Sequence, residues 1–370
     1  MSGARHLYLH LPFCAQRCGY CDFVTVIGRR GDHGRYVDAL LAELALEGDA
    51  LSPRLETIFL GGGTPTFTEP GALERLLAGL PDALEVTVEA NPETVTPELA
   101  ALLRRNRVNR VSLGVQSFHT PLLDVLDRVA GPDDTRRAMH VLRAAGFDNL
   151  SLDLIYGIPG EGAADLERDL AGAIALGPEH ISAYELETKP GTRFAHTHGA
   201  ELERVAESME TYFELVVETL TGAGYRWYET ANFSRAGGAA RGRDLRARHN
   251  LGYWLGRDYL GLGVGAVSTV GLRRWRNAPS LRGYLEAIEA GGGPSREVEL
   301  LTRETRDAER VMLALRLDEP LALAGLEHTL DEEGLAGLER LGLAERSAGA
   351  LALTARGRFL GDGVTARLLA

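Results

Sequence analysis

The sequence predicts an α/β protein: a partial (β/α)6 barrel followed by a small C-terminal winged-helix-like domain. Six short β-branched or aromatic runs alternate with amphipathic helical patterns in the first half of the chain, which is typical of a parallel sheet. Six strand–helix units are too few to close an eight-stranded barrel, so a partial barrel is expected. After a glycine-rich stretch, helical patterns dominate the last part of the chain.

The predicted strands are short runs bounded by helical patterns or turn residues. They are His6–His10, Thr57–Leu60, Glu85–Ala90, Arg110–Gly114, Leu150–Ile155 and His180–Tyr184. Leucines three and four residues apart mark the helices between them, as in the set Leu73, Leu76 and Leu77. Pro97 lies where a helix should begin and Gly146 where one should end.

Three domains are expected. Residues 1–225 form the barrel, and residues 226–295 form a mixed extension that ends in a linker, Gly291–Ser295. Residues 296–370 carry helical patterns at Arg303–Leu315, Leu321–Leu330 and Glu333–Leu341, an alternating stretch from Leu343 to Thr354 and a last helix. Three helices and a β-hairpin are similar to a winged helix. No basic recognition helix is evident, so this domain is expected to serve packing and partner contacts.

Composition narrows the class of function. The net charge of −12 argues against a nucleic-acid partner, which requires a basic face. No apolar run approaches the roughly 20 residues that span a bilayer, and the first residues do not form a signal peptide. With no disulfide pattern either, a cytoplasmic location is expected.

All three cysteines, Cys14, Cys18 and Cys21, lie in one eight-residue window, CAQRCGYC. Three thiolates at this spacing can hold three irons of a [4Fe–4S] cube, whose fourth iron then has no protein ligand and is open to another molecule. Two alternatives remain: a zinc site completed by His10 or a distant histidine, and ordinary buried thiols. A structural zinc site usually has two close pairs of ligands, and the chain has no second pair, so the open cluster is favoured.

A glycine triplet follows the second predicted strand, in FLGGGTPT. Gly62 and Gly63 allow close approach of a ligand to the backbone, and carbonyl oxygens with the Thr64 hydroxyl can accept hydrogen bonds from an ammonium group. S-adenosylmethionine (SAM) has an amino group beside a carboxylate, and these two groups can chelate the open iron.

Polar residues occur at the ends of the next three strands, namely Glu89, Gln116 and Asp153. The carboxyl ends of barrel strands converge on one ligand-binding rim. Carboxylates there can bond ribose hydroxyls, and Arg128 can bind a carboxylate. Singly each residue is more often a capped strand end, but together with the cysteine loop they favour a site.

The segments YLHLPFCAQRCGYCDF, GGGTPT, EANPE, GVQSF and DLIYGIPG together resemble the radical SAM family. Within it, the chain is similar to the group that contains oxygen-independent coproporphyrinogen III oxidases and the heme chaperone HemW. The similarity continues through HISAYELETKPGT, GYRWYETANF and YLGLGVGA, from about Tyr8 to the C-terminus.

The resemblance implies that Cys14, Cys18 and Cys21 bind the cluster. It also implies that a reduced cluster passes an electron to the sulfonium of SAM, giving methionine and a 5′-deoxyadenosyl radical. The positions that match SAM contacts are Tyr8, Tyr20, Gly62, Gly63, Thr64, Glu89, Gln116, Arg128 and Asp153, and Val267 matches a position that borders the same pocket.

Two departures separate the chain from the decarboxylases of this group and are shared with the chaperones. Only thirteen residues precede Cys14, and Phe23 stands where those enzymes have a further cysteine. A third shared feature is the HNxxYW pattern in RHNLGYW, with His249, Tyr253 and Trp254. This pattern implies axial ligation of haem by His249, aromatic cover from the other two residues, and nearby arginines that meet the propionates.

The sequence also departs from the chaperones in two segments. It has LDRVA, which keeps Arg128, and GAVS where relatives often carry histidines, and these losses affect the haem side alone. The expected function is therefore that of a radical SAM heme chaperone, with haem or another tetrapyrrole as ligand and haem-requiring apoproteins as partners, including membrane respiratory proteins. The alternative is an oxygen-independent coproporphyrinogen III oxidase, and a radical modifier of RNA is the weakest option because the protein is acidic.

Overall fold

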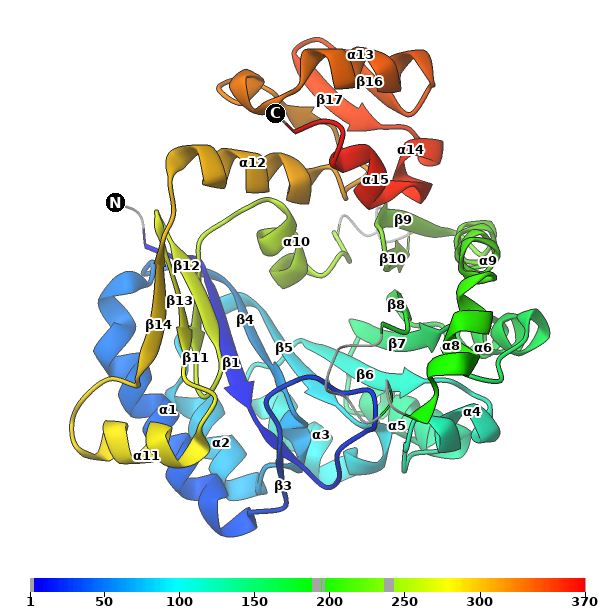
Figure 1. Ribbon diagram of the computed structural model, residues 1–370. Coiled ribbons are helices and arrows are strands. Elements are labelled where there is room, and N and C mark those ends of the chain that lie inside the picture. The colour runs from blue at the N-terminus through cyan, green and yellow to red at the C-terminus, as the bar shows by residue number, and fades with distance from the viewer. Residues whose placement is uncertain (1–2, 188–193, 195–196, 236–242, 370) are drawn as a thin grey trace.

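In the computed structural model, which describes residues 3–187, 194, 197–235 and 243–369, a twelve-stranded sheet forms the centre of the molecule (Figure 1). Its middle is a run of six neighbouring parallel strands in chain order. These are β1 (His6–Leu11), β4 (Leu55–Gly62), β5 (Ala83–Ala90), β6 (Arg110–Gln116), β7 (Leu150–Tyr156) and β8 (His180–Glu185). The predicted α/β fold with a parallel sheet is confirmed, and each predicted strand falls within an observed one.

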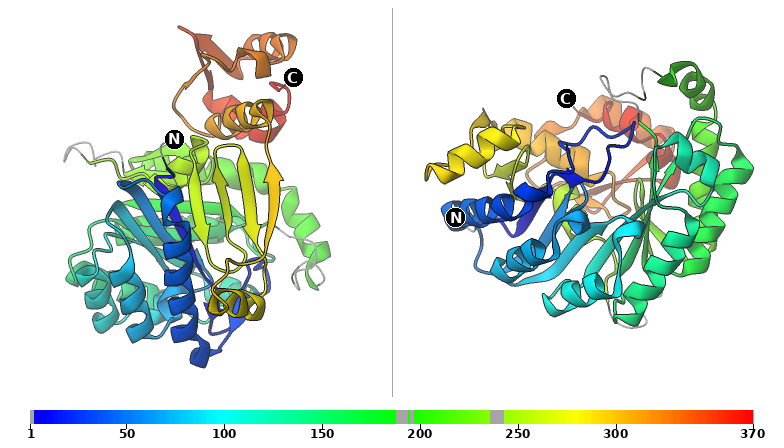
Figure 2. Two further views of the ribbon diagram at one scale, coloured as in Figure 1. Left: turned by 90° about the vertical axis from the view of Figure 1, so that its left-hand side faces the viewer. Right: turned by 90° about the horizontal axis from the view of Figure 1, so that it is seen from below.

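Helices cover the outer side of the curved sheet (Figure 2). The main ones are α1 (His33–Glu47), α2 (Pro70–Gly79), α3 (Pro97–Arg105), α5 (Pro132–Ala144), α6 (Ala163–Leu176) and α9 (Met209–Gly222), with the shorter α4 (Thr120–Val125) and α8 (Gly199–Ala206) between them. Leu73, Leu76 and Leu77 of α2 are buried as their spacing predicts. Pro97 is the first residue of α3, whose N-cap Thr96 accepts a hydrogen bond from the Leu99 amide at 3.2 Å.

The sheet extends beyond the six predicted strands on both sides. On one side β10 (Asn232–Arg235) pairs antiparallel with β8, and β9 (Tyr225–Glu229) pairs antiparallel with β10. On the other side β11 (Tyr259–Leu262) pairs parallel with β1 and is followed by three antiparallel strands. These are β12 (Val267–Val270), β13 (Arg273–Asn277) and β14 (Arg296–Leu300), with α11 (Leu281–Glu289) between the last two.

The stretch Gly291–Ser295 therefore joins α11 to β14 within the sheet, and the expected domain limits at residues 225 and 295 do not coincide with the ends of the sheet. Most residues of the edge strand β14 are exposed, and this includes the apolar Val298 and Leu300, although its sequence REVEL alternates polar and apolar residues.

The C-terminal residues form a separate hydrophobic cluster that includes Leu326, Leu335 and Leu351. Its elements are α12 (Arg303–Ala314), β15 (Leu321–Ala322), α13 (Glu332–Arg340), β16 (Ala344–Ser347), β17 (Ala350–Leu353), α14 (Ala355–Phe359) and α15 (Gly361–Thr365), with the sheet order β15-β17-β16.

Two predicted C-terminal helices and the hairpin are present, but the helix predicted at Leu321–Leu330 is absent. A two-residue strand, which pairs with β17, and a 3-10 turn at Glu327–Thr329 replace it, and Gly325 with a φ of 81° interrupts the chain between them. The predicted last helix is divided into α14 and α15. The winged-helix assignment stays a prediction.

The six parallel strands enclose a lumen, the space inside their curve, whose inward positions are mostly polar. Buried polar residues at these positions include Thr57, Glu85, Arg110, Ser112 and His180. The short helix α10 (Arg248–Trp254) closes the end of the lumen where the strands begin and lies below the C-terminal elements (Figure 1). No helix among the described residues is long and apolar enough to span a bilayer.

Candidate functional site

The cysteine loop and the glycine triplet lie side by side because β1 and β4 pair in parallel with Leu11 opposite Gly62. The Gly63 amide donates to the Leu11 carbonyl at 2.8 Å, and the Thr64 amide donates to the Phe13 carbonyl at 2.9 Å. A Cβ on Gly63 would lie 2.7 Å from the carbonyl carbon of Pro12, so this approach requires glycine. The loop returns through a second short pair, β2 (Phe13–Cys14) and β3 (Val26–Ile27), and is thus anchored at both ends.

The three thiols differ in their surroundings. The Cys14 Sγ is buried, 3.5 Å from the Thr64 hydroxyl oxygen, and the Cys18 Sγ accepts a hydrogen bond from Arg128 Nη1 at 3.7 Å. Burial raises the pKa of Cys14 and raises that of Cys21 to about 11. A cation that replaces the thiol protons relieves this cost, because thiolate is the form that binds iron. The loop therefore fits a group that supplies positive charge at its thiolates.

His10, the candidate fourth ligand of a zinc site, already makes other contacts. Both ring nitrogens of His10 are engaged, Nε2 with the Val24 carbonyl at 2.8 Å and Nδ1 with the Tyr8 hydroxyl at 3.1 Å.

A hydrogen-bond network joins the ends of β4, β5 and β6 to the cysteine loop. Arg128 Nη2 donates to the Asn91 side-chain oxygen at 2.9 Å and to the Gly114 carbonyl at 2.7 Å. Asn91 in turn donates to the Thr64 hydroxyl at 3.2 Å. Asn91 belongs to the motif EANPE but was not among the predicted site residues. Its position two residues after Glu89, just past the end of β5, could have indicated a role at the site.

Two non-glycine residues with a left-handed backbone lie in the same region. Gln116 adopts a φ of 67° where the register of β6 shifts, and Asp127 adopts a φ of 55° beside Arg128. Both are non-glycine residues in the left-handed region, which is uncommon and clusters at ligand sites. The Asp127 carboxylate also accepts a hydrogen bond from the Gly19 amide at 3.1 Å, so this strained turn holds the middle of the cysteine loop.

Glu89 on β5 and Asp153 on β7 line the same lumen cavity, with β6 between their strands. Burial, followed by repulsion from Asp153, raises the pKa of Glu89 to about 7, and burial also raises the pKa of Asp153. The Glu89 carboxylate accepts from the Gly62 amide at 3.2 Å, while Asp153 accepts from the Ser112 hydroxyl at 2.8 Å. A ligand that donates hydrogen bonds or carries positive charge would stabilise both carboxylates.

A lumen cavity of about 200 Å³ brings together several of the residues predicted from the sequence. Its lining includes Tyr8, Gly62, Glu89, Asp153, His249 and Tyr253. Tyr20 lies outside this lining and packs against an apolar cluster with Leu126 and Ile158. Val267 lies in β12, opposite Arg276 of β13, and does not line the cavity.

The HNxxYW pattern is divided between two environments. The His249 ring stacks on Phe59 with 5.0 Å between centroids, and its Nδ1 and Nε2 lie 2.7 Å from the Thr57 hydroxyl and 2.9 Å from the Tyr253 hydroxyl. Burial lowers the pKa of His249 to about 3, so the ring is neutral. Trp254 instead packs on the C-terminal elements, under the Arg316 guanidinium at 4.6 Å. The structure thus brings His249 and Tyr253 together and places Trp254 apart from them.

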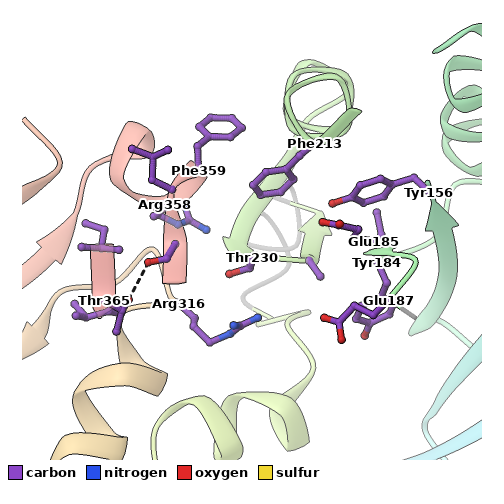
Figure 3. Close-up of a pocket in the computed structure, with 16 residues that line it drawn as sticks. Tyr156, Tyr184, Glu185, Glu187, Phe213, Thr230, Arg316, Arg358, Phe359 and Thr365 are labelled. Carbon is purple, nitrogen blue, oxygen red and sulfur yellow. Dashed lines mark hydrogen bonds between the residues drawn. The ribbon is translucent and has the colours of Figure 1, made fainter. Parts of the chain in front are cut away.

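A second cavity, of about 330 Å³, lies between the ends of β7 and β8 and the C-terminal elements (Figure 3). Tyr156, Tyr184 and Glu185 form one wall, and Arg358 with Phe359 lies opposite (Figure 3). The Arg358 guanidinium stacks on Trp227 at 3.7 Å and donates to its carbonyl at 3.0 Å. Burial lowers the pKa of Arg358 to about 10. The sequence did not indicate this cavity because its residues come from distant segments.

The arginines expected to meet propionates belong to the sequence segments Ser234–Asn250 and Leu272–Asn277. Several of them are paired with carboxylates. Arg243 bonds Asp148, Arg246 bonds Asp244, and Arg274 bonds Glu309 at 2.7 Å. Arg241 lies outside the described residues. The paired arginines would have to exchange partners to bind an anion.

Comparison with known proteins matches residues 8–171 to the Radical SAM superfamily. The chain is 39% identical to the heme chaperone HemW of Mycobacterium tuberculosis, over 98% of this chain and 94% of that protein. The chain belongs to the HemW family of radical SAM proteins. HemW of Bacillus subtilis is 33% identical over 96% of this chain and 97% of its own length. HemW of Escherichia coli is 36% identical over 71% of this chain and 70% of its own length.

The fold is also shared with a solved structure, the coproporphyrinogen III oxidase HemN of Escherichia coli. It superposes with a TM-score of 0.82 at 24% identity, covering 99% of this chain and 90% of HemN. The radical SAM assignment implies a [4Fe–4S] cluster and SAM as the cofactors of this HemW-family chain. When bound, these cofactors supply one-electron cleavage of a sulfonium carbon–sulfur bond.

Replacing Cys18 with Ala should abolish the cluster, because two thiolates leave two of its irons without protein ligands. In anaerobically reconstituted protein, the ~400 nm band and the content of about four irons per chain should both be lost. Asp22→Ala, an exposed change in the same loop, is the matched control and should keep both. An unchanged iron content in C18A would contradict the cluster assignment.

SAM affinity should fall as the pH drops below about 7, because the Glu89 carboxylate is then protonated and becomes a weaker acceptor. Between pH 8 and pH 6 the ionised fraction falls about tenfold, so Kd should rise by up to about tenfold. Calorimetric titration across this range measures the change. Glu89→Gln should flatten the profile, and the exposed Glu98→Gln should not; a wild-type Kd independent of pH would refute this role for Glu89.

Proposed function

We propose that this protein is a heme chaperone that carries a [4Fe–4S] cluster and SAM, binds haem and transfers it to haem-requiring apoproteins. The similarity to heme chaperone HemW over 98% of the chain carries this proposal. It acts in the cytoplasm. Its recipients are respiratory proteins, including membrane-bound ones, with an iron-storage protein as a further partner.

The cofactor side of the proposal assigns the cluster to Cys14, Cys18 and Cys21. Arg128 bonds the Cys18 sulfur and reaches the strand ends through Asn91, so it can fix the position of a carboxylate beside the cluster. Glu89 and Asp153 are the acceptors for ribose hydroxyls. The remaining proposed SAM contacts are Tyr8, Tyr20, Gly62, Gly63, Thr64 and Gln116.

The haem side rests on His249 as axial ligand, with Tyr253 and Trp254 as aromatic neighbours. His249 Nε2 can reach an iron only after it gives up the Tyr253 hydroxyl, since this contact is 2.9 Å long. The lumen cavity of about 200 Å³ is also too small for a whole tetrapyrrole, so haem must contact His249 after α10 moves.

The competing function, oxidative decarboxylation of coproporphyrinogen III, is supported by the fold it shares with HemN. Phe23 stands where the decarboxylases have a further cysteine, and it is 60% exposed at the mouth of the lumen cavity. A phenylalanine there supplies neither a thiol nor a proton to a reaction.

Haem transfer and decarboxylation can be tested on the same reconstituted protein. Haem-loaded protein mixed anaerobically with a haem-depleted b-type haem enzyme should restore the Soret band and the activity of that enzyme faster than an equal amount of free haem. In the parallel assay with coproporphyrinogen III, SAM and a reductant, no carbon dioxide should be released. Release of carbon dioxide, or transfer no faster than from free haem, would overturn the proposal.

Axial ligation by His249 can be tested by a pair of substitutions. His249→Ala should weaken haem binding and shift the Soret band. Tyr253→Phe removes the hydrogen bond that competes for Nε2 and should tighten haem binding by about 2- to 10-fold, the value of one hydrogen bond. Absorbance titration with haem measures both. If His249 only fills the lumen, neither change will alter the haem spectrum.

A further inference from the structure

Asn91 joins two hydrogen-bond branches that end at two different cysteine sulfurs. In one branch its side-chain oxygen accepts from Arg128 Nη2 at 2.9 Å, and Arg128 Nη1 donates to the Cys18 Sγ at 3.7 Å. In the other branch its side-chain nitrogen donates to the Thr64 hydroxyl at 3.2 Å, and this hydroxyl lies 3.5 Å from the Cys14 Sγ. A single amide group therefore bridges the two residues that contact these thiols.

The direction of each hydrogen bond follows from the chemistry of the groups. A guanidinium can only donate, so the oxygen of the Asn91 amide must face Arg128 and its nitrogen must face Thr64. The amide nitrogen can also only donate, so Thr64 is the acceptor of that bond. The single hydroxyl proton of Thr64 is then free to point at the Cys14 Sγ. Both branches thus direct a hydrogen-bond donor at a cysteine sulfur.

The backbone of Asn91 is held in place by contacts that are independent of these branches. Its carbonyl accepts from the Thr94 hydroxyl at 2.7 Å and from the Thr94 amide at 3.0 Å, in the 3-10 turn Pro92–Thr94. The Thr94 hydroxyl in turn lies 2.6 Å from the hydroxyl of Thr66, which follows the glycine triplet. Asn91 therefore has a fixed position directly after β5, between the ends of β4 and β6, and a residue that orients other groups requires such support.

We propose that Asn91 is a positioning residue that sets the reduction potential of the cluster, because it directs two hydrogen-bond donors at the cysteine sulfurs. These donors are the Thr64 hydroxyl and the Arg128 guanidinium. Hydrogen bonds to ligating sulfurs raise the potential of an iron–sulfur cluster, since they stabilise the additional negative charge of the reduced state. The inference rests on the cofactor assignment within the proposed function, but it does not depend on haem transfer.

Removal of the Thr64 hydroxyl tests one branch. Thr64→Val should lower the equilibrium constant for one-electron reduction of the cluster about tenfold, a shift of about 59 mV, because one hydrogen bond to sulfur is lost. Thr64→Ser keeps the hydroxyl and should keep the potential. Thr66→Val is the matched control, since it removes a buried hydroxyl of the same segment that contacts Thr94 and should also keep the potential. An EPR-monitored redox titration of the reconstituted protein without SAM measures each potential.

Asn91→Asp tests whether the amide directs that hydroxyl. An aspartate carboxylate has no hydrogen to donate, so the Thr64 hydroxyl would donate to it and turn away from the Cys14 sulfur. Thr64→Val should therefore lower the reduction constant about tenfold in the wild-type background and by less than about twofold in the Asn91→Asp background. If Asn91 only supports the fold, the effect of T64V will be the same in both backgrounds, and that result would overturn the proposal.

Comparison of Asn91→Asp with the wild type provides a test even if T64V assembles no cluster. The lost hydrogen bond to sulfur and the added negative charge both lower the potential, so an unchanged potential in N91D would overturn the proposal. A wild-type protein that assembles no cluster would overturn the cofactor assignment and this inference together. Failure of haem transfer in a protein that shows the expected potentials would count against the proposed function alone.

Discussion

The parallel pairing of β1 with β4 is the constraint on which the site depends. It fixes the cysteine loop, which leaves β1 at Leu11, against the glycine triplet, which leaves β4 at Gly62. The two amide–carbonyl contacts from Gly63 and Thr64 leave no room for a side chain between the segments. A register shift of one residue would turn the alternating side chains to the opposite face and separate Thr64 from the Cys14 thiol.

A polar lumen is the second organising feature. Barrels of this kind are commonly filled by branched apolar side chains, whereas here the inward positions carry acids, hydroxyls, imidazoles and one arginine. Such a lumen cannot collapse into a dry core without stranding these groups, so it keeps a cavity. The apolar core lies instead between the sheet and its outer helices, where residues such as Leu60, Leu76 and Val88 are buried.

The six parallel strands, and the meeting of Cys14 with Thr64 at one edge, were predictable because local periodicity and the geometry of parallel strands determine them. The outer strands β9 to β14 were not, since they have four or five residues each and their pairing is set by distant segments. The position of His249 in the lumen depends on its contact with Thr57, 192 residues earlier in the chain. Arg110 could have been noticed as a charged residue that opens an apolar strand, VSLGV, but the sequence alone cannot show that it is buried near Glu85, Glu89 and Asp153.

The short helix α10 contacts two separate parts of the molecule. Within seven residues it presents His249 and Tyr253 to the inside of the barrel and Trp254 to the C-terminal elements, where Arg316 lies on the indole and bonds Glu229 at 2.8 Å. The C-terminal elements and the closed end of the lumen therefore share one seven-residue helix, so a shift of either side changes the contacts of the other.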